Sequence, residues 1–153
     1  MLYRKATESD CRAVYDMICD MEAKVLPWAP FADIFRAQLA DERYECLIRE
    51  EDGRAVAMLN LRYERQLHHA DAIAEIMELV VAAPYRNAGR GAELLAYACE
   101  RAAQRGCVQI EVACNQLRKD THRFYLREGM QNFHYKFSKS LTGDAPAGTA
   151  LGR

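Results

Sequence analysis

The chain has 153 residues and a mass of 17.5 kDa; half of its residues are hydrophobic and 28% are charged. This balance is typical of one folded domain with its own core and excludes a disordered chain. Twenty-one basic residues stand against 22 acidic ones, for a formal net charge of −1. That charge argues against a general nucleic-acid binder, because contacts to phosphates need an excess of basic side chains.

Neither a membrane partner nor a secretion signal is expected. No apolar run approaches the roughly 20 residues that cross a bilayer, and residues 1–5 have no apolar segment behind their charges. The six cysteines form no C-x-x-C pair. Reduced, structural cysteines in a cytoplasmic protein are therefore expected.

A strand and a helix are predicted at the start of the chain. Residues 2–6 form a short candidate strand. Apolar residues at helical spacing follow over residues 14–25, and Ser9 or Asp10 can cap the helix that they predict. Pro27 ends that helix.

An aromatic loop and a hairpin come next. Residues 27–31, P-W-A-P-F, predict a loop before a shorter helix over residues 32–39. Strands are predicted over residues 44–49 and 55–63. The E-D-G sequence at residues 51–53 is a hairpin signal that joins them.

The middle of the chain predicts a strand, a loop and a helix in succession. Residues 73–82 form a central strand, since only Glu75 and Glu78 interrupt an apolar run. A loop with two glycines follows over residues 84–91. Residues 92–104 then have the apolar spacing of an amphipathic helix.

Three further elements are predicted toward the C-terminus. Residues 108–113 form a strand, and a last helix begins at Asp120 or Thr121 and runs through Arg127. Aromatic and polar residues alternate over residues 133–137, as in a half-buried strand.

The order β-α-α-β-β-β-α-β-α-β predicts an α/β fold with one mixed sheet and helices on its faces. No internal repeat or linker divides the chain. We therefore expect one domain over residues 1–141 and a weakly packed Gly/Ala/Pro-rich tail over residues 142–153.

The glycine loop carries the first functional signal, R-x-x-G-x-G from Arg86 to Gly91. A loop that opens a helix offers unpaired backbone N–H groups, and glycines let that backbone approach a phosphate closely. Arg86 and Arg90 would add positive charge at its rim. The pattern differs from the dinucleotide fingerprint and from the P-loop, and by itself it equally fits a plain turn before a surface helix.

In its setting, this pattern resembles the acetyl-CoA loop of the GNAT acetyltransferase superfamily. Residues 108–115 resemble that superfamily's fifth strand, and H-R-F-Y-L-R-E-G at residues 122–129 resembles its final helix. The segment H-H-x-x-x-I-x-E-I-x-E-L-V-V at residues 68–81 is similar to the aminoalkylphosphonate N-acetyltransferases, over roughly residues 10–141.

The resemblance implies a fold and an activity. The fold is a single GNAT-like α/β domain, whose mixed sheet splays open between its fourth and fifth strands. The activity is transfer of acetyl from acetyl-CoA, the co-substrate, to the primary amine of a small molecule, by direct attack in a ternary complex. An aminoalkylphosphonate or a similar anionic amine is the expected acceptor. A homodimer is expected only because superfamily members are often dimers.

Three residues are predicted to handle protons. An alkylamine is protonated near neutral pH, so a base is needed. Glu75 is the first choice, because a carboxylate inside an apolar strand is unusual; a solvated or arginine-paired Glu is the alternative. Glu78 is the second choice, and it shares a face with Glu75 only if a bulge intervenes; a substrate or metal contact and a structural ion pair are its alternatives. The resemblance implies that Tyr125 is the general acid, against the alternative of core packing.

The resemblance also implies the contacts to acetyl-CoA. A bulge near residues 79–81 would free backbone groups for the acetyl arm, and the glycine loop would hold the pyrophosphate. Asn115, at the end of a strand, is expected either to contact the co-substrate or, equally, to be a plain turn residue. The residues so assigned are Leu79, Val80, Val81, Arg86, Asn87, Ala88, Gly89, Arg90, Gly91, Asn115 and His122.

Trp28, Phe31 and His68 are assigned to the acceptor. The two aromatic residues replace a more polar stretch expected in the resembled subfamily, so they either cap the core or line a more apolar pocket. His68 and His69 are adjacent and face opposite sides of a strand, so no metal-ligand set is assigned, although a divalent metal is left open.

Two other functions stay open at the level of sequence. One is acetylation of a protein N-terminus, a lysine or an aminoacyl-tRNA. The other is a non-catalytic acyl-CoA-binding module, which the presence of Glu75 and Tyr125 argues against.

Overall fold

The computed structural model of the protein describes residues 1–143. The chain forms two compact units, Met1–Val112 and Ala113–Arg153. From residue 144 on, the predicted tail over residues 142–153 lies outside the described residues. The domain boundary at residue 141 stays a prediction.

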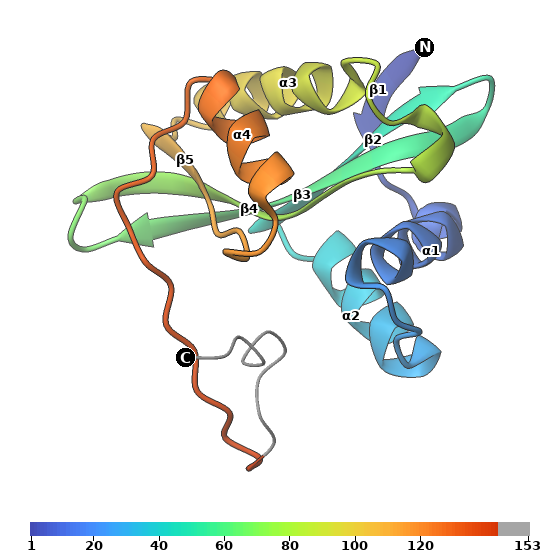
Figure 1. The fold of residues 1–153 in the computed structure, drawn as a ribbon, viewed down its shortest axis with the longest axis horizontal. Coiled ribbons are helices and arrows are strands. Elements are labelled where there is room, and N and C mark those ends of the chain that lie inside the picture. Colours follow the sequence, from blue (N-terminus) through green and yellow to red (C-terminus); the bar gives the residue numbers. More distant parts are fainter. Residues whose placement is uncertain (144–153) are drawn as a thin grey trace. The chain divides into compact units, whose positions relative to one another are not determined.

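The first unit is built on a five-stranded mixed sheet (Figure 1). Neighbouring strands are antiparallel from the first to the fourth, whereas the fourth and fifth are parallel. The strands follow one another in space as in the chain: β1 (Leu2–Lys5), β2 (Tyr44–Glu51), β3 (Arg54–Gln66), β4 (Asp71–Val81) and β5 (Gln109–Val112). The predicted hairpin between β2 and β3 is confirmed, with positive φ angles at Asp52 and Gly53.

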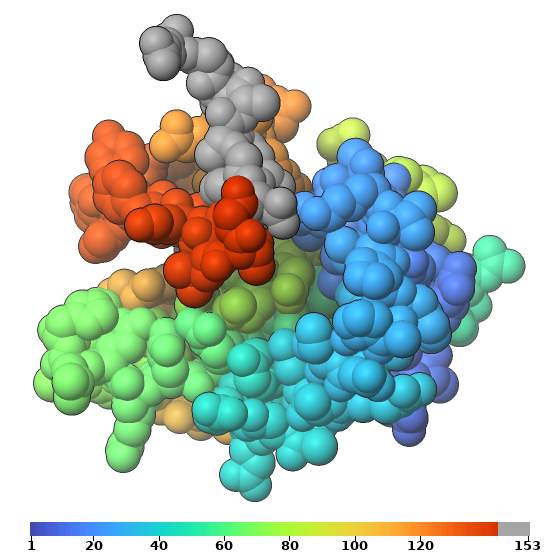
Figure 2. All heavy atoms as spheres, turned by 90° about the horizontal axis from the view of Figure 1, so that it is seen from below, coloured from blue at the N-terminus to red at the C-terminus, as the bar shows by residue number. Residues whose placement is uncertain are grey.

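Helices cover both faces of this sheet, which confirms the predicted α/β architecture (Figure 1). α1 (Cys11–Glu22) and α2 (Trp28–Leu39) lie on one face, and α3 (Arg90–Gln104) lies on the other. Figure 2 views the molecule from the side of α1 and α2. The short 3-10 turns η1 (Glu8–Asp10) and η2 (Ala83–Tyr85) lead into α1 and toward α3.

The core lies on both faces of the sheet. On the α1 and α2 face, apolar residues of the two helices pack against β2, β3 and β4, with Val14, Phe35 and Met58 among them. On the other face, α3 buries its apolar stripe: Leu94, Leu95, Ala98 and Ala102. Burial of apolar surface contributes about 25 cal/mol per Å² and is the main force that holds these layers together.

The sheet splays open between β4 and β5, as expected. β5 pairs in parallel only with Ile73–Ile76 of β4. Residues 77–81 of β4 therefore have no strand partner on that side within residues 1–112. Their backbone groups on that side are left to other partners.

A β-bulge lies in β4 at Met77. Glu78 is opposite Asn60 and Ile76 is opposite the next residue of β3, so Met77 is an extra residue in the pairing. The bulge lies two residues before the position expected near residues 79–81. It cancels the normal alternation, so Glu75, opposite Arg62, and Glu78 face the same side of the sheet.

Two predictions in the first half of the chain are wrong in detail. Residues 28–31 are not a loop but the first turn of α2. Pro30 fits there, because the first N–H groups of a helix have no partner to lose. The helix predicted through residue 25 ends at Glu22, where Ala23 takes a left-handed φ of 53°.

In the second unit, α4 (Lys119–Arg127) confirms the predicted last helix, and Gly129, with a φ of 84°, follows its end. The strand predicted over residues 133–137 is wrong, because these residues have no strand assignment and no ladder hydrogen bonds. Phe133, Tyr135 and Phe137 are each more than three-quarters exposed. Alternation predicts a strand only where an edge is available to pair with it.

The start of α1 is fixed by the buried carboxylate of Asp10. It accepts two hydrogen bonds from Arg4, at 2.7 and 2.9 Å, and one from the backbone N–H of Thr7 at 2.8 Å. These donors stabilise the charged form, so the pKa of Asp10 is lowered, chiefly by Arg4.

We predict that Asp10→Ala lowers the free energy of unfolding at pH 7 by about 1–3 kcal/mol, since it removes both hydrogen bonds from Arg4, which keeps its ion pair with Glu50, and the bond that caps the Thr7 N–H. The folded pKa of Asp10 lies below its unfolded value. The contribution of Asp10 to the free energy of unfolding is therefore present at pH values above its unfolded pKa, and it is lost as the pH falls through its folded pKa. Urea denaturation at pH 7 and at pH 3 measures this, and an equal loss at both values contradicts it.

Candidate active site

The glycine loop joins η2 to α3 and leaves its backbone donors free. Asn87 and Gly89 have φ angles of 61° and 77°. Within residues 1–143, no protein acceptor is found for the N–H groups of residues 87–91. Because α3 begins at Arg90, its positive dipole end adds to these donors. The loop therefore fits an anion such as a phosphate.

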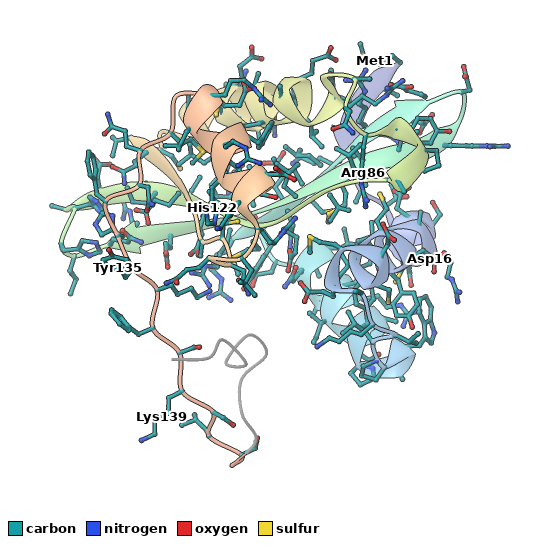
Figure 3. All side chains as sticks on the ribbon, in the orientation of Figure 1. Met1, Asp16, Arg86, His122, Tyr135 and Lys139 are labelled. Atoms are coloured by element: carbon teal, nitrogen blue, oxygen red, sulfur yellow. The ribbon has the colours of Figure 1, made fainter. Side chains whose placement is uncertain are left out.

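The two arginines of the loop are both paired with carboxylates. Arg86, which is labelled in Figure 3, bonds Asp20 of α1 and donates from Nε to the Val81 carbonyl at 2.9 Å. Arg90 makes two hydrogen bonds of 2.9 Å to Glu51 and holds the pKa of that carboxyl at about 2. Arg90 thus ties the start of α3 to the β2–β3 hairpin.

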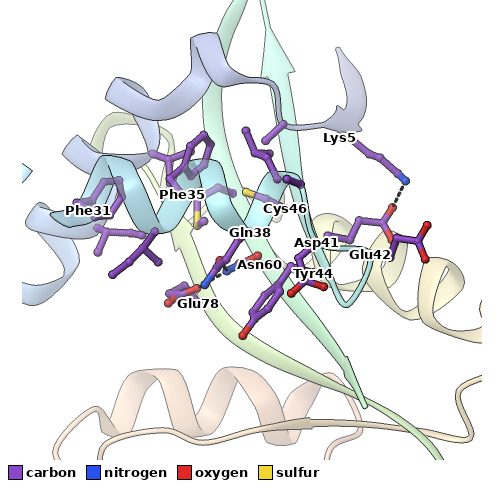
Figure 4. Close-up of a pocket in the computed structure, with 18 of the residues that line it drawn as sticks. Lys5, Phe31, Phe35, Gln38, Asp41, Glu42, Tyr44, Cys46, Asn60 and Glu78 are labelled. Atoms are coloured by element: carbon purple, nitrogen blue, oxygen red, sulfur yellow. Dashed lines mark hydrogen bonds and ion pairs between the residues drawn. The ribbon is translucent and has the colours of Figure 1, made fainter. Parts of the chain in front are cut away.

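A cavity of about 720 Å³ lies between α1, α2 and the sheet in the first unit (Figure 4). Much of its wall is apolar: Ala6, Val14, Ile18, Leu26, Phe31, Ile34, Phe35, Leu39 and Met58. In its interior, three polar side chains point toward one another: Gln38 of α2, Asn60 of β3 and Glu78 of β4. Lys5, Asp41, Glu42, Glu45 and Arg105 also line it.

Glu78 has the environment of a proton acceptor. Burial raises its pKa, and the charge of Glu22 raises it further, while the hydrogen bond from Asn60 lowers it. That hydrogen bond, from Asn60 Nδ2 to Glu78 Oε2, is 2.9 Å long. Within residues 1–143, Glu78 has no cationic side chain in ion-pair range. A carboxylate with a raised pKa and no ion pair is a stronger base than an exposed one.

Glu75 has a different environment, although the bulge places it on the same face. Its Oε2 accepts a hydrogen bond of 2.6 Å from Arg62, which also contacts Glu64. Glu75 is not part of the cavity lining. The structure thus shows the arginine-paired arrangement that sequence analysis set against its catalytic role.

The three predicted acceptor residues lie in different places. Phe31 lines the cavity. Trp28 is 42% exposed and packs edge-on against Tyr15, with ring centroids 5.0 Å apart, outside that lining. His68 lies in the exposed β3–β4 turn beside His69, with ring centroids 4.2 Å apart.

Sequence reasoning missed Gln38 and Asn60. The signal for Asn60 was available, because it is the one polar residue in the apolar run of residues 55–61. Gln38 gave no such signal, since its partner lies on a different element.

Nothing within residues 1–143 brings together three or more His, Cys, Asp or Glu side chains that could hold a metal ion. The divalent metal that sequence analysis left open therefore has no ligand set in this part of the chain. The same residues include no helix long and apolar enough to cross a membrane.

The second unit carries the remaining predicted residues. Tyr125 of α4 is 9% exposed, and burial raises its pKa to about 12, with the neighbouring Cys114 adding to the effect. Asn115 Oδ1 accepts a hydrogen bond of 2.9 Å from the backbone N–H of Leu117, as in a turn. His122 Nε2 donates to the Asn115 carbonyl at 2.7 Å, so its ring closes the same turn.

The loop and the splayed sheet are features of a class of proteins, the acyl-CoA-dependent acetyltransferases. The model of the acetyltransferase (GNAT) family matches residues 11–130. The chain belongs to this family and is an acetyltransferase. Family membership implies acetyl-CoA as the co-substrate, and the free N–H groups of the loop fit its phosphates.

A particular relative has a known reaction. The chain is 41% identical over 138 residues to the aminoalkylphosphonate N-acetyltransferase of Salmonella typhimurium, and the match covers 90% of each chain.

Solved structures share the fold. A Bacillus halodurans protein described as a transcriptional regulator has a TM-score of 0.84 and 25% identity, over 91% of this chain and 98% of its own. Glucosamine-6-phosphate N-acetyltransferase from Arabidopsis thaliana has a TM-score of 0.76 and 20% identity, over 92% and 97%. At this identity, the second likeness concerns the fold alone.

We predict that Glu78→Gln raises the free energy of unfolding more at pH 8 than at pH 4, because a neutral amide replaces a carboxylate whose charged form burial destabilises. The pKa of Glu78 is higher in the folded than in the unfolded state. Glu78 therefore does not destabilise the fold at pH values below its unfolded pKa, and the destabilisation grows as the pH rises through its folded pKa. Glutamine keeps an oxygen for Asn60 and carries no charge. Thermal unfolding at pH 4 and pH 8 tests this, and a stabilisation that is the same at both values contradicts it.

Proposed function

We propose that the protein acetylates the primary amine of a small anionic molecule, with aminoalkylphosphonates as the first candidates, by direct transfer from acetyl-CoA in a ternary complex. The observation that carries this proposal is Glu78, a partly buried carboxylate of raised pKa in the wall of a cavity. The 41% identity to an aminoalkylphosphonate N-acetyltransferase supports the acceptor class.

Cationic side chains at one end of the cavity support an anionic acceptor. Lys5 and Arg105 are part of its lining. With Arg101 they surround the buried carboxylate of Glu45, at 3.6, 4.0 and 2.6 Å, so three positive charges meet one negative charge. Asp41 and Glu42 line the same cavity, and Asp41 is paired with Arg43.

Glu78 is the proposed general base. Its Oε atoms would take a proton from the acceptor's ammonium group, which must become a neutral amine before it can attack a carbonyl carbon. Its raised pKa, caused chiefly by burial, favours this transfer. Glu75 is the second candidate, because the bulge places it on the same face.

The co-substrate supplies the acetyl group as a reactive thioester. The residues proposed to hold its phosphates are Asn87, Ala88, Gly89, Arg90 and Gly91, whose N–H groups have no protein acceptor within residues 1–143, and Arg86, whose guanidinium adds positive charge at the rim. Backbone groups of Leu79, Val80 and Val81, on the open side of β4, are proposed to hold the acetyl arm. Asn115 and His122 are proposed as further contacts by family resemblance.

Tyr125 is proposed to give its Oη proton to the departing sulfur. Its raised pKa of about 12 keeps the phenol protonated at neutral pH, which is the form a general acid needs. A homodimer and a cytoplasmic location stay predictions.

We expect release of CoA from acetyl-CoA to be fastest with aminoalkylphosphonates in a panel that also holds amino-sugar phosphates, polyamines and amino acids. Glu78→Gln should lower kcat about 10²–10⁴-fold, the usual worth of a general base. Glu100→Gln, a change at an exposed carboxylate on α3, is the matched control and should leave kcat within twofold. If Glu75→Gln lowers kcat by this factor and Glu78→Gln does not, Glu75 is the general base. Tight acetyl-CoA binding without release for any amine would overturn the small-molecule proposal.

We predict that Tyr125→Phe lowers turnover by about 10²-fold or more and leaves the acetyl-CoA dissociation constant within threefold, because only the proton donor is removed. Steady-state kinetics and calorimetric binding of acetyl-CoA measure the two effects separately. Unchanged turnover would exclude Tyr125 as the acid.

A further inference from the structure

Asn60 carries a buried acceptor atom without a partner. Only 6% of the residue is exposed, and its Oδ1 makes no hydrogen bond within residues 1–143. An unsatisfied polar atom of this kind is costly, and folded proteins retain few of them. Asn60 lines the cavity, so a bound molecule that shifts the side chains covering Oδ1 is the natural source of the missing donor.

The orientation of the Asn60 amide is fixed by its neighbours. Its Nδ2 donates to Gln38 Oε1 and to Glu78 Oε2, both at 2.9 Å (Figure 4). A flipped amide would set Oδ1 against the carboxylate of Glu78. Both N–H groups are thus used, and Oδ1 is the group left to accept a hydrogen bond.

The geometry points to Asn60 as the residue that positions the acceptor's nitrogen and makes the site select a primary amine over a hydroxyl group. This inference rests on the proposed function, with Glu78 as the base. A primary ammonium has three N–H donors, so one can go to Glu78 and another to Asn60 Oδ1. After Glu78 has taken its proton, the bond to Asn60 still holds the nitrogen.

A hydroxyl group cannot serve both residues. It has one O–H, so a donation to Glu78 leaves Asn60 Oδ1 without a partner in a buried site. Sites built to pair with a substrate donor discriminate strongly against analogues that lack it, because their own polar groups are then left unpaired. Glu78 attracts an ammonium by its charge, and Asn60 adds the part of the selection that depends on a second N–H donor.

The test compares Asn60→Val with Asn60→Thr, two side chains of nearly the same shape that suit a strand. Valine removes the acceptor, whereas the threonine hydroxyl can still donate to Glu78 and accept from an amine. The probes are 2-aminoethylphosphonate as substrate and 2-hydroxyethylphosphonate as competitive inhibitor. Thermal unfolding confirms that each variant is folded.

We expect Asn60→Val to raise the KM for the amine about 10-fold or more, to leave the KM for acetyl-CoA within twofold, and to leave the inhibition constant of the hydroxyl compound nearly unchanged. Asn60→Thr should restore part of the amine KM. The acid limb of the kcat/KM profile should move to higher pH in Asn60→Val, since the pKa of Glu78 loses a hydrogen bond that lowers it. The other groups facing Glu78, Glu22 and Cys46, are unchanged.

A folded Asn60→Val enzyme with the wild-type amine KM overturns the inference and leaves the proposed function intact. An equal rise in the KM for the amine and in the inhibition constant of the hydroxyl compound also overturns the inference, because it would indicate a merely structural role. If the wild-type enzyme releases no CoA with any primary amine, the proposed function fails and the inference fails with it. If only Asn60→Thr folds, a KM for the amine that rises more than the inhibition constant of the hydroxyl compound supports the inference, and an equal rise of both contradicts it.

Discussion

The change of partners along β4 is the constraint on which the candidate site depends. Up to Ile76 this strand pairs on both sides, with β3 and β5; beyond it, only β3 remains. At the same point Met77 enters as an extra residue. The lost partner opens the sheet, and the bulge turns Glu78 to the α1 and α2 face. The free strand edge that is proposed to hold the acetyl arm and a carboxylate beside the cavity thus arise from two irregularities in one strand.

Three polar side chains, Gln38, Asn60 and Glu78, lie together in a largely apolar wall, where unpaired polar atoms destabilise the fold. Their mutual hydrogen bonds reduce this destabilisation. Asn60 satisfies both of its N–H groups and gives Glu78 one bond, which limits the rise of the pKa that burial causes. α2 supplies the third member, Gln38, from its last turn, which lies within the helix predicted over residues 32–39.

Ion pairs of its two arginines anchor the glycine loop. Both of its arginines contact carboxylates of distant segments, Asp20 on α1 and Glu51 on β2. These pairs anchor the loop at both ends, while the N–H groups between them have no protein acceptor within residues 1–143. The anion-binding capacity of the loop thus lies in its backbone and in the dipole of α3.

The sequence determined the mixed sheet, the helices on both faces, the hairpin and the glycine loop, because each depends on local spacing and turn residues. The sequence pointed to Glu75 and Glu78 because they interrupt an apolar strand, and to Phe31 because it stands where the resembled subfamily has a more polar stretch. Tertiary structure decided which of them meet: the pairing of Glu75 with Arg62, the contact of Glu78 with Asn60, and the place of Phe31 in the cavity. The alternation over residues 133–137 failed to predict a strand for the same reason. Local pattern reports the face a side chain prefers, whereas register, bulges and partners are set by segments far apart in the chain.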